Sequence, residues 1–371
     1  MKILISTPLF PPDIGGPATY SKVLAEEFPK YGVNVEVLSF GGVRHLPKII
    51  RHAVYFCRVF WRARKADIIF AQDPVSVGFP SALASMILRK PFILKVVGDY
   101  AWEQGVNRFG VKELLDEFLN TPHGWRIEFL RRVERFVANR ARAVIVPSRY
   151  LKSVVEKWGI ESGKIKVIYN SVQLRYIEVE KEKVRKESDL AGKILVSVGR
   201  LVPWKGFEML IGIMPEISKK YPDTKLLIIG SGPEESALKA KSYQLKANVQ
   251  FLGNLPHEQV LKYLRAADIF LLNTGYEGFS HQILEAMVVG APIISTHSGG
   301  NREILKDREN SIVVGYNDKE AWVRAIFELF ENSSLYSGIL QNSKIDIARF
   351  SGQNMIEETL KVLKYIPNSR E

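Results

Sequence analysis

The chain has 371 residues, 46% of them apolar, and a formal net charge of +12. This length allows two ordinary domains and is too great for one compact core. A single cysteine, Cys57, excludes an internal disulfide and fits a reducing compartment. No run reaches the roughly 20 apolar residues that cross a bilayer, and residues 1–6 are too few for a signal-peptide core, so we expect a cytoplasmic protein.

Short runs rich in Val, Ile and Leu alternate with helical stretches along the whole chain. The predicted strands are residues 2–6, 34–39, 67–71, 92–97, 143–147 and 166–169 in the first half, and residues 193–198, 225–229, 249–252, 268–272, 292–295 and 311–314 in the second. Nearly continuous apolar runs are typical of strands covered on both faces. Alternation with helices predicts an α/β fold with two doubly wound parallel sheets, each in a Rossmann-like domain.

The predicted first domain is residues 1–175 and the second is residues 192–349. The charged segment 176–191 is expected to link them, and residues 350–371 to form a helix that crosses back to the first domain. Ligands of open α/β sheets bind beyond the carboxyl ends of the strands. The sequence therefore predicts a site in a cleft between two facing domains.

The basic charge is concentrated in residues 44–65. This segment holds seven Lys or Arg residues and no acidic residue, interleaved with apolar and aromatic side chains. A cationic, aromatic helix fits contact with an anionic membrane. It fits equally a core helix whose long basic side chains cover its solvent-facing side. A surface for a soluble anionic acceptor is a third, less favoured alternative.

Glu277 and Glu285 carry the clearest chemical signal. The residues before them predict a buried strand, and a helix is expected to start at Ser280 as N-cap and to stop at Gly290. Glu285 then lies roughly 8 Å along the helix axis from the N-terminus. A helix N-terminus suits a phosphate, and ionised carboxylates accept hydrogen bonds from hydroxyl groups. This order of groups predicts a nucleotide sugar as ligand.

Two further loops have residues suited to a diphosphate. Arg200 and Lys205 lie on a glycine-bounded loop after the seventh strand, where fixed cations would neutralise a leaving diphosphate unless they are plain surface charges. Gly15 and Gly16 follow the first strand. They would let the backbone approach a phosphate or sugar, or they would serve a loop that needs positive φ.

Together these motifs resemble the retaining GT-B glycosyltransferases of family 4. The resemblance covers nearly the whole chain, with matching segments at residues 15–16, 170, 199–206, 230–233, 251–253, 277–287 and 298–303. It implies that Glu285 holds the ribose hydroxyls, that Glu277 contacts the transferred sugar, and that Arg200 and Lys205 hold the diphosphate. It also implies that no metal ion or other cofactor is needed.

The resemblance assigns further residues to the two substrates. The donor contacts that it implies are Gly15, Gly16, Gly199, Gly232, Leu252, Gly278, Phe279, Ser280 and Glu285. Members of the family often have a histidine before the aspartate that follows the fourth strand, but this chain has Gly98 before Asp99. Asp99 and Glu103 are therefore candidates for acceptor contact, with a helix N-cap as the structural alternative for Asp99.

The resemblance implies transfer of a sugar, with retention, to a hydroxyl of a glycan or lipid-linked acceptor in cell-envelope or exopolysaccharide synthesis. A UDP-sugar is the expected donor, with GDP-mannose next. A nicotinamide-dependent dehydrogenase is disfavoured because no Gly-x-Gly-x-x-Gly opens a helix after a strand. A nucleic-acid-binding protein would leave Glu277 and Glu285 unexplained. A GT-B epimerase, a phosphorylase, or a relative that binds sugar nucleotides without transfer stays open.

Overall fold

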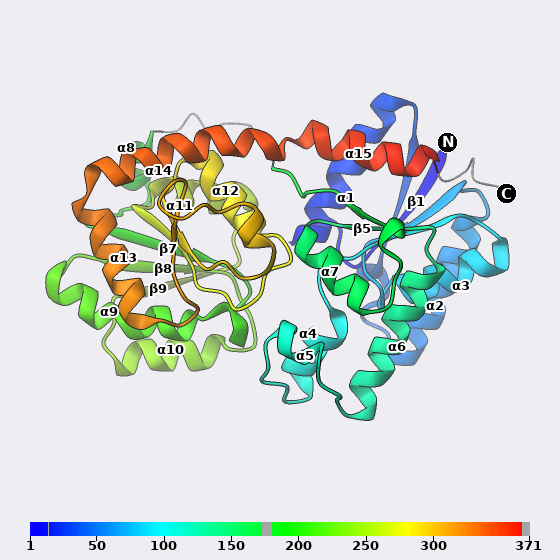
Figure 1. Cartoon of the computed structure of the whole chain (residues 1–371), viewed down its shortest axis with the longest axis horizontal. Helices are drawn as coiled ribbons and strands as arrows, with labels where there is room; N and C mark the ends of the chain where they lie inside the picture. The colour runs from blue at the N-terminus through cyan, green and yellow to red at the C-terminus, as the bar shows by residue number, and fades with distance from the viewer. Residues whose placement is uncertain (14, 173–179, 366–371) are drawn as a thin grey trace. The chain divides into compact units, whose positions relative to one another are not determined.

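The computed structural model describes residues 1–13, 15–172 and 180–365, apart from the side chains of residues 48 and 49. The chain divides into two compact units (Figure 1). The first unit comprises Met1–Asn170 and Gly352–Glu371, and the second comprises Ser171–Ser351. Part of the expected linker, residues 176–179, lies outside the described residues.

The first unit is built on a six-stranded parallel sheet in the order β2-β1-β3-β4-β5-β6. Its strands are β1 (Lys2–Thr7), β2 (Asn34–Ser39), β3 (Ile68–Ala71), β4 (Phe92–Lys95), β5 (Ala143–Val146) and β6 (Ile165–Val167). Its helices are α1 (Gly16–Glu27), α2 (Lys48–Ala63), α3 (Gly78–Leu88), α4 (Tyr100–Arg108), α5 (Leu115–Phe118), α6 (Trp125–Arg140), α7 (Arg149–Lys157) and α15 (Gly352–Tyr365).

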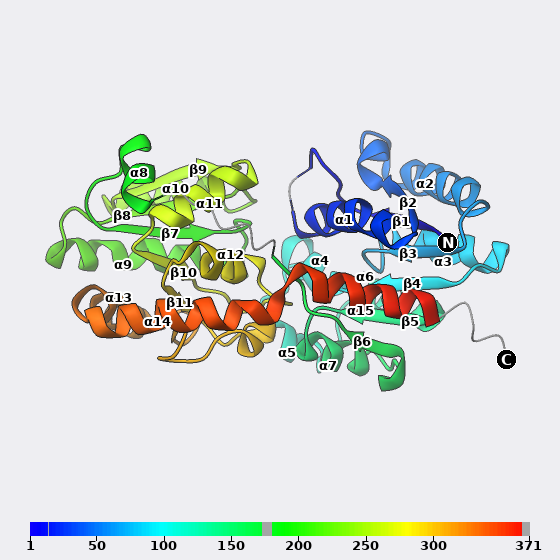
Figure 2. The ribbon, with the colours of Figure 1, turned by 90° about the horizontal axis from the view of Figure 1, so that it is seen from above.

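Helices cover both faces of this sheet. Helices α1 and α15 lie over one face of the sheet (Figure 2). Leu24 of α1 and Phe28, which follows α1, share a buried core with Met355 and Leu360 of α15. Helices α2, α3 and α6 pack against β1, β3 and β4 and against one another. The last helix of the chain is therefore part of the hydrophobic core of the first unit.

The second unit has its own six-stranded parallel sheet, in the order β12-β11-β10-β7-β8-β9. Its strands are β7 (Ile194–Val198), β8 (Lys225–Ile229), β9 (Val249–Gly253), β10 (Ile269–Leu272), β11 (Ile293–Ser295) and β12 (Ile312–Val313). Its helices are α8 (Lys181–Glu187), α9 (Phe207–Lys220), α10 (Glu235–Gln244), α11 (His257–Ala266), α12 (His281–Val289), α13 (Lys319–Glu331) and α14 (Ser333–Asp346).

Helix α8 belongs to the second unit, although its residues fall in the segment expected to be a linker. Lys181 and Arg185 of α8 form ion pairs with Asp268, at 2.9 and 2.6 Å. Asp268 also accepts a hydrogen bond of 2.8 Å from the Ile194 amide at the start of β7. These contacts bind α8 to the N-terminal ends of the central strands β7 and β10.

The predicted fold class is confirmed. All twelve predicted strands are present, with bounds within two residues of those expected, and both sheets are parallel with helices on their faces. The nearly continuous apolar runs correspond to strands that are buried along their whole length, such as β3, β4, β5, β7 and β10. None of the described helices has the length and hydropathy that crossing a membrane requires.

Candidate functional site

The candidate site lies at the point in the second sheet where the strand order reverses. Strands β7 and β10 are neighbours, and the strands that follow them lie on opposite sides. At such a point the two outgoing loops separate and leave room for a ligand beyond the carboxyl ends of the strands. The loop after β7 carries Arg200 and Lys205, and the loop after β10 carries Glu277.

Lys205 and Glu277 come together at this point. The Nζ atom of Lys205 and the Oε1 atom of Glu277 form an ion pair, with 11% and 12% of their side chains exposed. The backbone oxygen of Glu277 also accepts a hydrogen bond of 2.9 Å from the Gly300 amide. Two opposite charges are thus held in a largely buried position, where each compensates the other.

Arg200 differs from Lys205. Arg200 is exposed. Within the described part of the chain, its side chain forms no ion pair or hydrogen bond with another residue. Of the two cations predicted to hold a diphosphate, one is therefore paired with Glu277 and the other is open to a ligand.

A residue that the sequence analysis missed, Asn273, fixes the loop of Lys205. Asn273 is fully buried, and its Nδ2 donates to the Gly206 oxygen at 3.0 Å and to Asn317 Oδ1 at 2.7 Å. Its Oδ1 accepts from the Asn317 amide at 3.1 Å. Gly206 has a φ of 53°, and a Cβ there would lie 2.1 Å from Asn273 Nδ2. Asn273 and Gly206 therefore require each other, and together they set the position of Lys205.

The two glycines after β8, Gly230 and Gly232, have a structural reason for being glycine. The Leu201 amide donates to the Ser231 oxygen at 3.0 Å, which extends the pairing of the two strands into their loops. A Cβ on Gly230 would lie 2.0 Å from the Gly199 oxygen, and one on Gly232 would lie 2.3 Å from the Leu201 oxygen. Close backbone packing explains Gly230 and Gly232, whereas a Cβ on Gly199 would meet only ordinary contacts at 3.7 Å or more. The donor contacts of Gly199 and Gly232 stay a prediction.

Helix α12 begins and ends where the sequence predicted. Ser280 is its N-cap, with Oγ accepting from the Ile283 amide at 3.4 Å, and Gly290 closes it in the left-handed conformation with a φ of 72°. Glu285 lies in the second turn. Both the N-terminal position of Ser280 and the placement of Glu285 within the helix are confirmed.

Glu285 has a neighbour that the sequence analysis did not identify. Its Oε1 lies 2.9 Å from Nε2 of His257, the first residue of α11. The hydrogen bond to Glu285 raises the pKa of His257, against the effect of its partial burial. His257 follows β9 by a short loop, and this position beyond the carboxyl end of a strand could have suggested it.

The remaining donor candidates of the second unit are Gly278 and Phe279, in the loop before α12, and Leu252. Phe279 is 5% exposed, and its ring packs edge-on against Phe350 with centroids 5.5 Å apart. Its side chain therefore anchors the loop, and Gly278 precedes it in the same turn. Leu252 lies in β9 and is partly buried. Backbone and side-chain contacts of these residues with a donor stay a prediction.

Gly15 and Gly16 stand at the start of α1 in the first unit. Gly15 is the residue before the helix, with a φ of 149°, and a Cβ on it would lie 2.9 Å from Cδ1 of Leu9. The loop that needs positive φ is thus present at Gly15. A ligand contact at either glycine stays a prediction.

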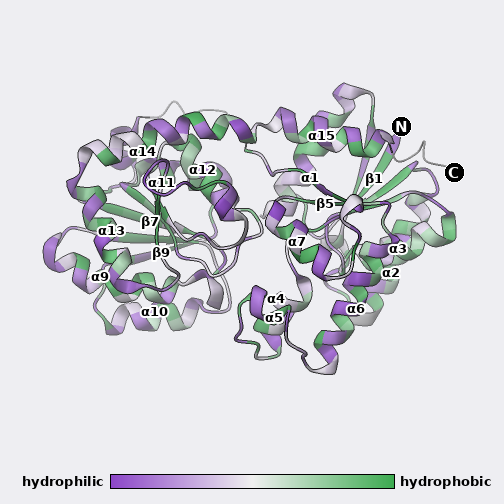
Figure 3. Ribbon diagram, in the orientation of Figure 1, coloured by the Kyte–Doolittle hydropathy of each residue, from purple (hydrophilic) through white to green (hydrophobic). Residues whose placement is uncertain are grey.

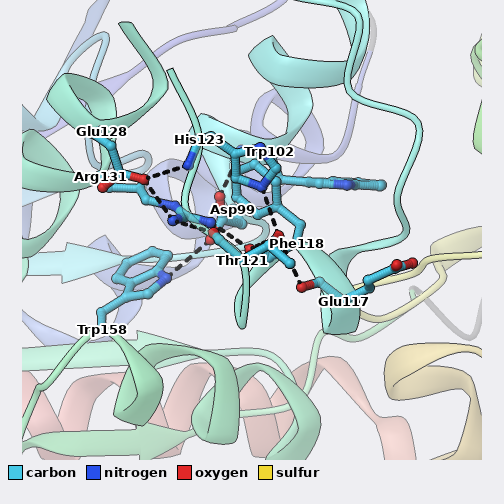
Figure 4. A network of polar contacts seen from close by, with 9 residues as sticks. All are labelled: Asp99, Trp102, Glu117, Phe118, Thr121, His123, Glu128, Arg131 and Trp158. Atoms are coloured by element: carbon cyan, nitrogen blue, oxygen red, sulfur yellow. Dashed lines mark hydrogen bonds and ion pairs between the residues drawn. The ribbon is translucent and has the colours of Figure 1, made fainter. Parts of the chain in front are cut away.

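Asp99 has the capping role that was its structural alternative (Figure 4). It is 1% exposed. Its Oδ1 accepts from the Trp102 amide at 2.8 Å as N-cap of α4, and its Oδ2 accepts from Nε1 of Trp158 at 3.0 Å. Both carboxylate oxygens therefore have protein partners. Glu103, in the first turn of the same helix, is partly exposed.

A second buried carboxylate, Glu134, lies at the N-terminus of α4. It accepts from the amides of Tyr100 at 2.7 Å and Ala101 at 3.4 Å. Burial, and next the charge of Asp99, raises the pKa of Glu134, while burial raises that of Asp99. Two acids at one helix terminus suit its positive dipole end, so they serve to fix α4.

Polar contacts hold the segment between α4 and α6, and Figure 4 shows those of Arg131. Arg131 of α6 pairs with Glu128 at 2.8 Å and donates to the backbone oxygens of Phe118 at 2.5 Å and Thr121 at 3.0 Å. The indole of Trp102 donates to the Glu113 oxygen at 2.9 Å. These contacts fix the segment that connects α4 to α6.

Comparison with protein families identifies both units. The model described as glycosyl transferases group 1 matches residues 178–346, and the model described as glycosyl transferase 4-like domain matches residues 16–171. An uncharacterized glycosyltransferase of Methanocaldococcus jannaschii is 28% identical, with 98% of each chain covered. A phosphatidylinositol N-acetylglucosaminyltransferase chain of Arabidopsis thaliana is 26% identical over 88% of this chain and 73% of its own.

Solved structures show the same fold. The HepE protein of Anabaena in complex with UDP-glucose has a TM-score of 0.79 at 20% identity, with 98% of this chain and 100% of that chain covered. Sucrose-phosphate synthase of Thermosynechococcus elongatus has a TM-score of 0.80 at 19% identity, with 98% of each chain covered.

Proposed function

The chain belongs to the glycosyltransferases of group 1 with the GT-B fold, and on that premise we propose that it transfers a sugar from a nucleotide diphosphate sugar to a hydroxyl of a glycan or lipid-linked acceptor. The observation that carries the proposal is the buried ion pair of Lys205 and Glu277 at the point where the strand order reverses, with Arg200 exposed on the same loop as Lys205. A UDP-sugar is the first choice of donor, supported by the UDP-glucose bound to HepE, and GDP-mannose is the second.

In this proposal the second unit binds the donor. Arg200 and Lys205 hold the diphosphate, Glu277 accepts hydrogen bonds from hydroxyls of the sugar, and Glu285 accepts them from the ribose. The paired state of Lys205 and Glu277 supports these roles, because a phosphate would replace Glu277 as partner of Lys205 and leave the carboxylate to accept from a hydroxyl. In the same way, the ribose hydroxyls would replace His257 as the partner of Glu285.

The chemistry that these groups suit needs no protein base. The bond between the anomeric carbon and the diphosphate oxygen breaks, and the acceptor oxygen bonds to the same carbon from the face that the diphosphate leaves, which retains the configuration. The acceptor proton passes to a diphosphate oxygen. Two fixed cations lower the energy of the departing charge, a contribution that other enzymes show to be worth orders of magnitude in rate. We propose that the enzyme is independent of metal ions for this reason.

We also propose that residues 44–65 contact the cytoplasmic face of a membrane, near a lipid-linked acceptor. Within α2, Ile50 is 51% and Trp61 is 64% exposed, so the solvent-facing side is itself apolar. Arg62 is engaged by Glu36 at 3.1 Å, whereas Arg64 lies over the Trp61 ring at 4.4 Å. A helix that only covered its outer side with long basic side chains would not expose these residues.

The function is tested by incubating the protein with UDP-glucose, UDP-N-acetylglucosamine and GDP-mannose and following release of the nucleoside diphosphate. We expect turnover with one donor, equal in the presence of EDTA, and an α-linked product by NMR of the anomeric proton if the donor is α-linked. Binding of a donor without release of the nucleoside diphosphate, whichever acceptor is added, would favour a relative that binds sugar nucleotides without transfer. Product of inverted configuration would refute the retaining mechanism.

A further inference from the structure

Helix α6 of the first unit carries bulky aromatic side chains on its solvent-facing side. Trp125 is 76% exposed, Phe129 59% and Phe136 40%. Their spacing of four and seven residues places them along one stripe of the helix. Contiguous exposed apolar surface of this kind marks an interaction site, whereas scattered single residues do not.

Helix α3 continues the apolar surface. The rings of Phe79 and Phe136 have centroids 6.1 Å apart, so the two helices meet at this contact. Ile87, two turns further along α3, is 62% exposed and Met86 is 44% exposed. Helix α3 contains no charged residue and is largely apolar in Figure 3. The exposed apolar side chains therefore extend across two neighbouring helices.

The same side of α6 is cationic. Arg126, Arg132 and Arg135 are exposed, whereas the two glutamates of the helix are withdrawn. Glu134 is buried, and Glu128 forms an ion pair of 2.8 Å within the helix. The exposed stripe thus combines aromatic rings with positive charge that its own acids do not neutralise.

A basic pocket lies at the carboxyl ends of α3 and α6. Its volume is about 170 Å³, and the described residues that line it are Arg89, Lys90, Phe92, Arg140 and Arg142. Four of these are cations and none is an acid. Cations at a helix C-terminus are common because they suit the helix dipole, but that effect does not require them to surround a common pocket. A phosphate group is the natural ligand of several guanidinium groups around one space.

We propose that the α3–α6 surface docks on an anionic lipid bilayer, with the pocket taking the phosphate of one lipid headgroup. The α3–α6 surface is defined by Phe79, Ile87, Trp125, Phe129, Phe136 and the pocket residues. Aromatic side chains are enriched at the headgroup level of membranes, and each cation near an anionic bilayer strengthens binding about fivefold. A second copy of the chain is a poorer occupant, because pairing this face with itself would bring the arginines together.

This inference deepens the membrane contact proposed for residues 44–65, but it rests on different helices and fails separately. The test is co-sedimentation of the full chain with phosphatidylcholine vesicles that contain or lack phosphatidylglycerol. The variants are Trp125→Ser/Phe129→Ser and Arg89→Gln/Arg140→Gln. The matched control is Tyr243→Ser, which removes an aromatic side chain that is 89% exposed in the second unit.

The aromatic double variant should bind anionic vesicles at least tenfold more weakly, because it removes two rings that would otherwise leave water. The arginine double variant should lose roughly 25-fold on anionic vesicles and show no added loss on neutral ones. Tyr243→Ser should bind as the wild type does. All side chains changed are at the surface, and equal melting temperatures would confirm that each variant is folded.

Wild-type binding by both double variants would overturn the proposal. If Trp61→Ser alone abolished binding, the membrane contact of residues 44–65 would stand and the α3–α6 surface would not be part of it. If the Trp125→Ser/Phe129→Ser variant bound vesicles as strongly as the wild type but lost a concentration-dependent self-association that the wild type showed, the proposal would be overturned. The surface would then be a contact between copies of the chain. Turnover with a soluble acceptor is measured in parallel, so that loss of catalysis is distinguished from loss of docking.

Discussion

Asn273→Ala should both destabilise the second unit and slow transfer. The change removes two donated hydrogen bonds of 3.0 and 2.7 Å and one accepted bond of 3.1 Å, all at a fully buried side chain. At about 1 kcal/mol for each bond, the free energy of unfolding should fall by about 3 kcal/mol. For a unit of this size, that corresponds to a melting temperature lower by roughly 6 to 12 °C.

The slower transfer follows from the position of Lys205. Without Asn273, the backbone oxygen of Gly206 loses its hydrogen-bond donor. Lys205, the residue before Gly206, then loses its fixed position next to Glu277. We therefore expect kcat to fall at least tenfold at a temperature where the variant is folded, since misplacing one charge-stabilising group has effects of this size.

The assay combines thermal unfolding with steady-state kinetics, and Asn248→Ala is the control. Asn248 donates one hydrogen bond of 3.0 Å to the Thr224 oxygen at the opposite edge of the same sheet, so its loss should cost about 1 kcal/mol and leave kcat unchanged. If Asn273→Ala lowered stability no more than the control did, the Asn273 network would not anchor this loop. If it lowered stability but left kcat intact, the link between Gly206 and Lys205 would be refuted.

Three other changes test the roles of individual charged groups. Glu277→Gln should slow transfer by orders of magnitude yet bind free UDP at least as tightly as the wild type in calorimetry, because the phosphate no longer competes with the carboxylate for Lys205; weaker UDP binding would contradict this. His257→Gln should lower the free energy of unfolding in urea most below pH 6.5 and not at all well above it. The bond to Glu285 raises the pKa of His257 in the folded state, so its contribution to stability is lost as the pH rises through that pKa. An equal difference between variant and wild type at all pH values would exclude the pair. Asp99→Ala should lower the free energy of unfolding by about 2 kcal/mol without changing the acceptor KM, since it removes a helix cap and a second hydrogen bond; a raised KM would restore Asp99 to the acceptor site.

The sequence was sufficient for the fold because the strands are buried on both faces. Runs such as residues 194–198 and 269–272 contain few polar residues, so their short length, their apolar composition and their flanking loops identify them as strands without tertiary information. Ser280 and Gly290 were predictable for a similar reason, since a helix cap and a left-handed stop depend on local backbone chemistry.

The partners of the site residues were not predictable in the same way. The pairing of Lys205 with Glu277 and of His257 with Glu285 joins residues 72 and 28 positions apart, and the strand order decides which segments meet. The role of Asn273 depends on the fit between its side chain and the Gly206 turn, which the sequence alone does not reveal. Both carboxylate oxygens of Asp99 have partners because the Trp102 amide binds one and Trp158, 59 residues further along the chain, binds the other.

The pairing of Lys205 with Glu277 has a consequence for recognition. Lys205 alone, largely buried, would be an uncompensated charge, and so would Glu277; each is tolerated because the other is present. A donor with both a diphosphate and a sugar would satisfy the two groups at once, since its phosphate would take Lys205 and its hydroxyls would take Glu277. A free nucleoside diphosphate would take only the first and would leave the carboxylate without a partner. Under the proposed roles, the site would therefore match the intact nucleotide sugar and would favour release of the nucleotide after the sugar has gone.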